Sequence, residues 1–555
     1  MWDIFSGKAR SSASQFVELP WKKVYTSLVK SDSIKPLAIV VNIIIIAAMF
    51  FIHVKFSSYA FDDAYIHFRV ARSQLDTGFP YFNEGDPVKV SSSSVWVVVL
   101  TGLLAAARSF GFENYFPLLV SFFNAVVIFM GMLIFTQILE ALLRKHLSLV
   151  DRLLFQIPYL AFLLPSSTGL METGFALLMA GLGILLLLRS SPWGFAILGL
   201  AVFVRMELLI LLGLTVLFLL LQKRFSVYQT IGYSILGFVP FTLYDLYYYQ
   251  TLIPHSVIAK PTVYSIEWFQ TTADILFYSL PNIAITGGIV LAVLGMILLA
   301  YMLTTLLVAF QERKGSIGTW ALLFCLWAMV TVSGYIIGRV FVFDWYRPLY
   351  MVPIIIGSTI CLFAIENPKI LGIKIVTFVI AFISAVSVMR SLYASIANPG
   401  LYSTFELGAR VKVYQQVGAI LHERFPNATL LTSEIGGLGY SFKGKILDAA
   451  GLASPDALDF HPLKVPQQRA NGNVGAIPPE YVRSTLPDLI VSFDIFSEAL
   501  LKDDVTSLYN QILIPAYLPE DEKLAMTKTI WGSRYLRIYI LRDLPIPQEI
   551  LSYGN

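Results

Sequence analysis

Residues 36–54 read PLAIVVNIIIIAAMFFIHV, and residues 61–69, shortly after, read FDDAYIHFR. The first stretch is apolar over nearly the 20 residues that a helix needs to cross a bilayer. The second places two adjacent carboxylates, Asp62 and Asp63, just beyond the end of that helix. The pair of stretches predicts a membrane span followed directly by an acidic loop.

The composition of the whole chain agrees with a membrane protein. Of its 555 residues, 56% are hydrophobic and 14% are charged, whereas soluble domains carry about 25% charged residues. This number of charged residues is too small to cover a surface that faces water. Lipid must therefore be part of the surroundings. The net charge of +4 is too small to indicate nucleic-acid binding. Cys325 and Cys361 both lie in apolar runs, which excludes a disulfide framework and a cysteine-based metal site.

Lysines and arginines set the expected topology, because they concentrate in cytoplasmic segments. They place residues 1–35 in the cytoplasm, and residues 55–92 then form an outer loop. Residues 94–107 are short for a span, and we interpret them as a helix in the outer interface, since a full span there would move Arg144 and Lys145 outside. Further spans are predicted at 116–140, 153–166, 172–188, 193–206, 207–221, 228–247, 284–309, 318–337, 348–364 and 370–389.

Eleven spans in all predict a polytopic α-helical protein of the cell membrane. The transmembrane domain covers residues 36–390, and the odd count sends residues 391–555, the tail, to the extracytoplasmic (periplasmic) side. The short spans 153–166, 193–206 and 207–221 are typical of broken or re-entrant helices that line a cavity.

The tail alternates helical and strand patterns. Residues 410–424 have the apolar spacing of an amphipathic helix, and a turn is expected at Gly436, Gly437 and Gly439. Strands are predicted at 429–433, 445–448, 488–493 and 535–541. The sequence therefore predicts a soluble α/β domain.

The outer loop supplies the first candidate site residues. In a helix that starts at Asp62, residues seven apart share a side, so Asp62, Tyr65, His67 and Arg69 lie on overlapping faces. A carboxylate near the membrane with an arginine beside it is suited to act as a general base. The alternative is that Asp62 or Asp63 only caps the helix.

A second set of ionisable residues maps to the outer ends of the spans. Such groups at membrane depth often mark function. Glu172 and the Arg205–Glu207 pair each interrupt an apolar run, and the alternative for them is an ion pair that only holds helices together. The full set is Glu172, Arg205, Glu207, His255, Lys260, Arg339, Asp344 and Arg347. Carboxylates and cations meeting at one face are what a phosphate-bearing lipid substrate needs.

Several of these segments, in this order, resemble the GT-C-fold glycosyltransferases that use polyprenyl-phosphate sugars. The resemblance is greatest to the group that includes the mycobacterial terminal arabinofuranosyltransferase, and more distant to aminoarabinose transferases and protein O-mannosyltransferases. The matching segments are Asp62–Ile66 with Arg69, Gly78 to Val88, Ser91–Trp96, Gly169–Thr173, Val204–Glu207, Leu252–His255 with Ala259–Lys260, Tyr346–Tyr350, Gly436–Tyr440 and Leu447–Leu452. The sequence departs from the family at Arg205-Met206-Glu207 and at Pro254-His255, where the family has Arg-Pro-acid and Pro-Asn.

The resemblance implies an inverting transfer of a pentofuranose such as arabinose, or of a hexose, from a polyprenyl-phosphate donor to a hydroxyl of a glycan, lipid or glycoprotein acceptor. Asp62 or Asp63 would be the catalytic base. The donor phosphate would bind to Arg69, Arg205, Lys260, Arg347 and His255, and the substrates to Tyr65, His67, Glu172, Glu207 and Tyr346. No cofactor is obligatory, while a divalent cation on Asp62 and Asp63 stays open. The competing functions are a lipid-linked sugar transporter or flippase and a non-catalytic glycan-assembly protein.

Overall fold

The structure is a computed structural model that describes residues 36–264, 266–278, 301, 303–308, 316–364, 371–402, 404–463, 476–516 and 533–553. The described residues before Phe50 and those from Phe50 onward belong to two separate units. All the site residues discussed below belong to the second unit.

The predicted apolar segments are helices in the structure. Their bounds are α3 Pro36–Phe56, α4 Asp62–Thr77, α5 Ser94–Ser109, η1 Glu113–Tyr115, α6 Phe116–Leu143, α7 Leu149–Thr168, α8 Thr173–Leu188, α9 Trp193–Ala201, α10 Leu208–Leu221, α11 Val227–Tyr249, α12 Ser256–Tyr264, α13 Trp268–Tyr278, α15 Ser316–Ile337, α16 Pro348–Ala364 and α17 Leu371–Ile396. The predicted span 284–309 lies largely outside the described residues.

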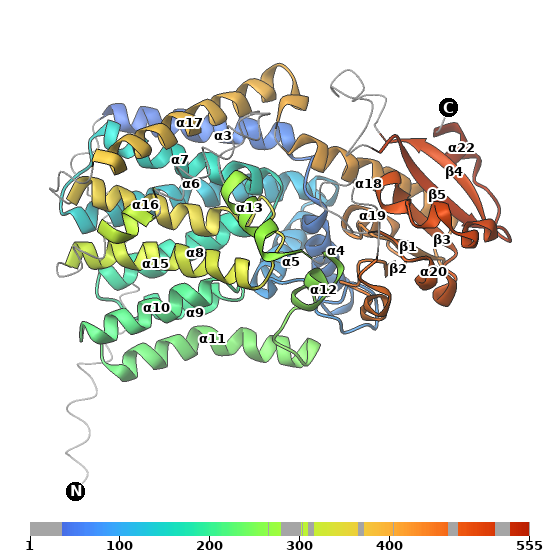
Figure 1. Cartoon of the computed structure of the whole chain (residues 1–555), viewed down its shortest axis with the longest axis horizontal. Coiled ribbons are helices and arrows are strands. Elements are labelled where there is room, and N and C mark those ends of the chain that lie inside the picture. The colour runs from blue at the N-terminus through green and yellow to red at the C-terminus, as the bar shows by residue number, and fades with distance from the viewer. Residues whose placement is uncertain are drawn as a thin grey trace, which may run out of the picture. The chain divides into compact units, whose positions relative to one another are not determined.

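Among the described residues, five helices are long and apolar enough to cross a membrane: α3, η1 with α6, α7, α15 and α17. Helices α5, α8, α10 and α16 are apolar but shorter. The chain is thus a multi-pass membrane protein, and the number of eleven spans stays a prediction. Helices α15 and α16 pack side by side (Figure 1).

Of the three spans predicted to be short, 193–206 and 207–221 correspond to short helices, whereas 153–166 does not. Helix α7 is 20 residues long, because the side chains of Ser148 and Asp151 form a capping box that starts it earlier than its apolar run. Helix α9, in contrast, has 9 residues, and α10 starts only at Leu208. The segment between them carries Arg205 and Glu207, whose charges interrupt the apolar run.

The tail contains a mixed five-stranded sheet with the order β2-β1-β3-β5-β4. Strands β2, β1 and β3 are parallel, while β5 is antiparallel to both β3 and β4. The bounds are η3 Pro399–Leu401, α18 Phe405–Arg424, β1 Thr429–Thr432, α19 Gly436–Phe442, β2 Lys445–Asp448, η4 Pro455–Phe460, α20 Pro479–Thr485, β3 Leu489–Phe493, α21 Asp494–Ser497, η5 Leu500–Lys502, η6 Asp504–Leu508, β4 Tyr509–Pro515, β5 Tyr535–Leu541 and α22 Gln548–Tyr553. The four predicted strands and the helix within 410–424 are confirmed, and β4 was not predicted.

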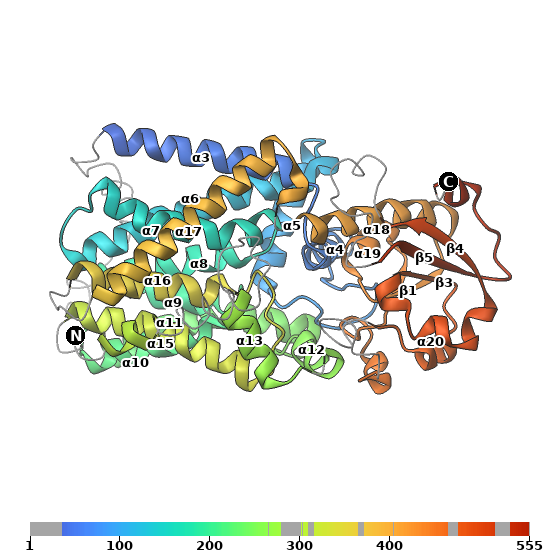
Figure 2. The ribbon, with the colours of Figure 1, turned by 45° about the horizontal axis from the view of Figure 1, so that its top comes forward.

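The core of the tail lies on both faces of β3, whose five residues are all buried. Ile490 packs on one face with Tyr481 and Tyr539, and Phe493 contacts Tyr414 of α18 with ring centroids 4.8 Å apart. The predicted turn at Gly436 is instead the start of α19, and this helix packs against α4 and α18 (Figures 1 and 2).

Candidate functional site

The candidate site is a cavity of about 370 Å³ at the ends of several helices. Segments far apart in the sequence form its wall, as the family resemblance predicts. The lining residues include Asp63, Ile66, His67, Ser92, Met171, Glu172, Arg205, Met206, Glu207, Lys260, Tyr335, Arg339, Trp345, Tyr346 and Leu452.

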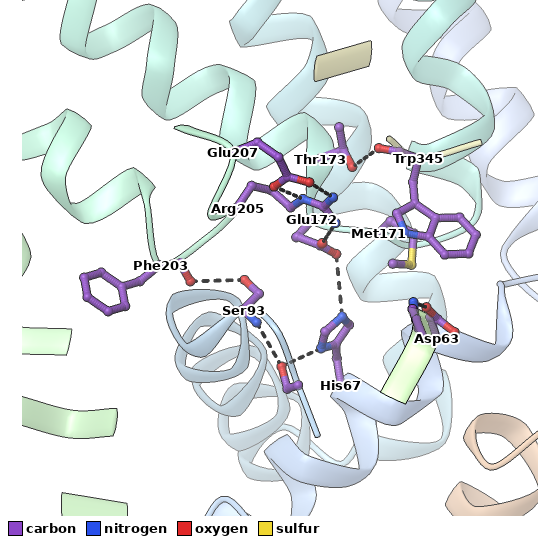
Figure 3. Close-up of polar contacts among 12 residues, drawn as sticks. Asp63, His67, Ser93, Met171, Glu172, Thr173, Phe203, Arg205, Glu207 and Trp345 are labelled. Atoms are coloured by element: carbon purple, nitrogen blue, oxygen red, sulfur yellow. Dashed lines mark hydrogen bonds and ion pairs between the residues drawn. The ribbon is translucent and has the colours of Figure 1, made fainter. Parts of the chain in front are cut away.

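Helix α4 presents Asp63 and His67 to this cavity. The two residues are four positions apart, so their side chains lie on the same helix face. Figure 3 shows His67 pointing toward Glu172, and His67 Nε2 lies 3.6 Å from Glu172 Oε2. The other ring nitrogen, Nδ1, is hydrogen-bonded to Ser91 Oγ at 2.8 Å. The hydrogen bond to Ser91 thus orients the His67 ring so that Nε2 faces Glu172.

A buried ion-pair network continues from Glu172 along the cavity wall (Figure 3). Arg205 donates to Glu172 Oε1 at 2.8 Å and to both carboxylate oxygens of Glu207, at 2.5 and 3.2 Å. Glu207 also accepts from the hydroxyl of Tyr335 at 2.9 Å, and the guanidinium lies 4.5 Å from the ring centre of Tyr346. With one cation between two carboxylates, this network leaves one negative charge on the cavity wall.

Lys260 supplies a cation next to Asp63. Its ammonium lies 3.4 Å from Asp63 Oδ2 and stands over the rings of Phe343 and Tyr346, with 4.7 and 5.9 Å to the ring centres. The faces of aromatic rings attract a cation electrostatically, and because the rings carry no net charge the ammonium keeps its positive charge. A carboxylate and a cation therefore lie side by side on the cavity wall.

Asp62 faces away from the cavity, although it adjoins Asp63 in the sequence. Its carboxylate accepts from the backbone amides of Gly436 at 2.9 Å and Gly437 at 2.8 Å, at the start of α19. Burial, with a smaller contribution from the charge of Glu434, raises the pKa of Asp62 to about 7. The structure thus places Asp62 at the contact between α4 and the tail.

Tyr65 and Arg69 also lie at this contact and do not line the cavity. Arg69 donates to backbone carbonyls on both sides, at Phe82 (2.7 Å), Gly444 (2.7 Å) and Gly439. The ring of Tyr65 lies 5.4 Å from that of Tyr440. These side chains hold the outer loop against the tail.

His255 and Arg347 lie outside the cavity lining in the described part of the chain. The backbone amide of His255 donates to the carbonyl of Lys89 at 2.9 Å. Arg347 Nη1 pairs with Asp344 Oδ1 at 2.6 Å. Of the twelve sequence-predicted residues, the cavity brings together Asp63, His67, Glu172, Arg205, Glu207, Lys260 and Tyr346.

Sequence reasoning did not identify a buried ion pair beside the site. Lys89 Nζ lies 2.5 Å from Asp245 Oδ2, and both side chains are almost fully buried. Lys89 also donates to the carbonyl of Leu252 at 3.0 Å, so it connects the outer loop to α11 and to the segment that leads into α12. A signal was available, because Asp245 is a carboxylate inside the apolar run 228–247.

The two aspartates do not form a shared cation site in this arrangement. Asp62 accepts from two amides at the start of α19, while Asp63 faces Lys260. Within the described residues, no group of three or more His, Cys, Asp or Glu side chains is arranged to hold a metal ion. Hard cations favour several converging oxygen ligands, so this pair does not fit one.

The chain is similar in fold to ArnT from Cupriavidus metallidurans. The apo structure of that protein has 11% sequence identity and a TM-score of 0.50, covering 92% of this chain and 99% of the other. A structure of ArnT bound to undecaprenyl phosphate gives 12% identity and a TM-score of 0.49 over the same shares. No protein-family model and no curated protein sequence matches the chain. The chain thus has the GT-C fold of ArnT, with apolar helices and a C-terminal mixed sheet.

Proposed function

We propose that this protein transfers a sugar from a polyprenyl-phosphate donor to a hydroxyl group of a cell-envelope acceptor, with inversion at the anomeric carbon. The observation that carries the proposal is the pair formed by Asp63 and Lys260, 3.4 Å apart on the wall of one cavity. An acceptor hydroxyl needs a base and a departing phosphate needs a cation, and this cavity offers both. The GT-C fold supports the same reading.

In the proposed reaction, Asp63 accepts the proton of the acceptor hydroxyl. At the same time, the oxygen of that hydroxyl forms a bond to the anomeric carbon of the donor sugar. The bond between that carbon and the phosphate oxygen breaks, and the electron pair leaves with the polyprenyl phosphate. Lys260 stabilises the phosphate, and the proton on Asp63 passes to water after the product leaves. General-base assistance contributes about 10²–10⁴ in rate, and fixed charges facing developing charge contribute several kcal/mol.

The other cavity residues receive roles from their contacts. Arg205 is already paired with Glu172 and Glu207, so we assign it to holding the cavity wall rather than to the phosphate. Arg339 also lines the cavity, and its pairing with Glu267 is long, at 3.6 Å, and exposed. An exposed pair at this distance is weak. Arg339 is thus our second candidate for phosphate binding.

His67, Glu207 and Tyr346 are proposed to contact the sugar, and Asp62 to anchor the tail. The donor sugar is a pentofuranose such as arabinose, or a hexose, and the acceptor is a glycan, lipid or glycoprotein.

The donor carries one phosphate, and Lys260 faces the base, so a divalent cation is not required. Chelation with EDTA should leave turnover unchanged. The protein would act in the cell membrane with its tail on the periplasmic side.

The test uses purified protein in nanodiscs with polyprenyl-phosphate arabinose or mannose and octyl glycoside acceptors. Asp63→Asn should lower kcat by about 10²–10⁴-fold, whereas Asp62→Asn, the matched control one residue away, should stay within tenfold of the wild type. Lys260→Met should reduce kcat/KM for the donor. Wild-type turnover by Asp63→Asn would rule out the base assignment. Donor counterflow in sealed vesicles, without any transfer, would favour a transporter.

A further inference from the structure

Among the described residues, the tail reaches the cavity at one position. Among the described lining residues, Leu452 comes from the tail and the rest come from residues 63–346. Leu452 belongs to the segment 449–454, here called the tail loop, which directly follows strand β2. The water-soluble part of the protein thus contributes an apolar surface to a cavity otherwise formed by the membrane domain and its loops.

The tail loop is held in shape by the carboxylate of Asp448. This buried side chain accepts from the backbone amides of Ala450 at 2.8 Å and Ala453 at 2.9 Å, on either side of Leu452. The amide of Asp448 donates in turn to Ser454 Oγ at 2.9 Å. These three hydrogen bonds close the loop, so the backbone on both sides of Leu452 is held in place.

The first residue of the tail loop, Ala449, is also attached to the body of the tail. The amide of Ala449 donates to the carbonyl of Thr432 at 2.8 Å, and His461 Nε2 is hydrogen-bonded to the carbonyl of Ala449 at 2.7 Å. Gly451 has φ +73, and a Cβ there would lie 2.4 Å from Leu458 Cδ2. A rigid loop of this kind presents a side chain at a constant position.

The neighbouring wall carries the proposed chemistry. The short helix η4, which follows the tail loop, packs against α12, and α12 carries Lys260, the partner of Asp63. Leu452 therefore shares the cavity with the base and the cation. Leucine has no hydrogen-bonding group, so it selects a substrate by shape.

We propose that Leu452 is a specificity-determining residue that limits the size of the acceptor reaching Asp63, and that Asp448 is its positioning residue. This inference rests on the proposed function. We assign Leu452 to the acceptor rather than to the donor. The tail is the water-soluble part of the chain, whereas the lipid of the donor would lie against the apolar helices. One methylene group more or less in an apolar binding site alters discrimination by about 10–200-fold.

The experiment compares two acceptors with farnesyl-phosphoryl arabinose or mannose as the donor. The small acceptor is an octyl monosaccharide and the large one an octyl trisaccharide, and hydrolysis of the donor by water is measured in parallel. Leu452→Ala should raise the ratio of kcat/KM for the large over the small acceptor by about tenfold or more. Leu452→Trp should lower this ratio while donor hydrolysis continues. Leu452→Met, which keeps a side chain of similar size, should have the wild-type ratio.

Leu501→Ala, an exposed leucine of the tail that does not line the cavity, is the matched control and should leave the ratio unchanged. Asp448→Ala should no longer discriminate between the two acceptors, because their KM values change. The kcat for hydrolysis of the donor by water should be retained. An unchanged ratio in both Leu452→Ala and Leu452→Trp, with an active wild type, would overturn this inference and leave the proposed function standing. A wild type that neither transfers nor hydrolyses any donor would overturn both.

Discussion

Asp62 and Asp63 are neighbours in the sequence, yet their side chains have different surroundings. Successive residues of a helix point about 100° apart, so a helix that lies between two bodies directs adjacent side chains to different ones. Helix α4 lies between the cavity and α19. On the cavity wall, Asp63 pairs with Lys260. The carboxylate of Asp62 accepts hydrogen bonds from the first two backbone amides of α19. The acidic doublet thus divides into a candidate base and an anchor for the tail.

The raised pKa of Asp62 predicts a pH dependence of stability. Burial, aided by the charge of Glu434, raises its pKa from 3.8 to about 7, so the folded protein holds this proton over a range where the unfolded chain has lost it. Stability should therefore fall as pH rises from about 4 to 7, by roughly 4 kcal/mol at most. We expect the melting temperature in nanodiscs to drop between pH 5 and pH 8 in the wild type. Asp62→Asn should show a smaller drop, and an equal drop would contradict the assignment.

At the scale of elements, the approach of α19 to α4 depends on a glycine. A Cβ at Gly436 would lie 1.8 Å from the backbone oxygen of Asp62, so the two elements would have to separate. Gly436→Ala should destabilise the protein by about 1–3 kcal/mol and reduce transfer, as measured by melting temperature and turnover. Gly102→Ala in α5 is the matched control, since nothing lies within 4 Å of its Cβ position. Equal stability of the two variants would argue against this close contact.

The outer loop is joined to α11 by a second element-scale contact. Lys89 and Asp245 form a buried ion pair at 2.5 Å, and Ser94 Oγ donates to the other oxygen of Asp245 at 2.5 Å. Lys89→Met would leave a buried carboxylate without its cation, which costs about 3–5 kcal/mol. The double variant Lys89→Met/Asp245→Leu should recover most of that stability, because neither charge remains. Thermal unfolding measures both, and a double variant no more stable than Lys89→Met would contradict an ion-pair role.

At the scale of the whole molecule, the predicted topology places the tail on the periplasmic side of the membrane. The chain has two cysteines, Cys325 and Cys361, and both are buried. A single cysteine introduced by Leu501→Cys, at an exposed position of the tail, should react with a membrane-impermeant maleimide on intact cells. Ser12→Cys, in the predicted cytoplasmic segment, should react only after permeabilisation. The reverse pattern would refute the predicted topology and place the proposed chemistry on the cytoplasmic face.

The sequence by itself determined the membrane class, the long apolar helices among the described residues, four of the five described strands and the group of ionisable residues from which the site is built. Apolar runs and alternation report local burial, so they identify elements such as α6 and β3 directly. They do not report which side chains meet. The separation of Asp62 from Asp63, the role of Arg69 at the tail and the arrival of Leu452 in the cavity depend on contacts across hundreds of residues. Only the tertiary structure decided these, because the direction of each side chain is set by how whole elements pack.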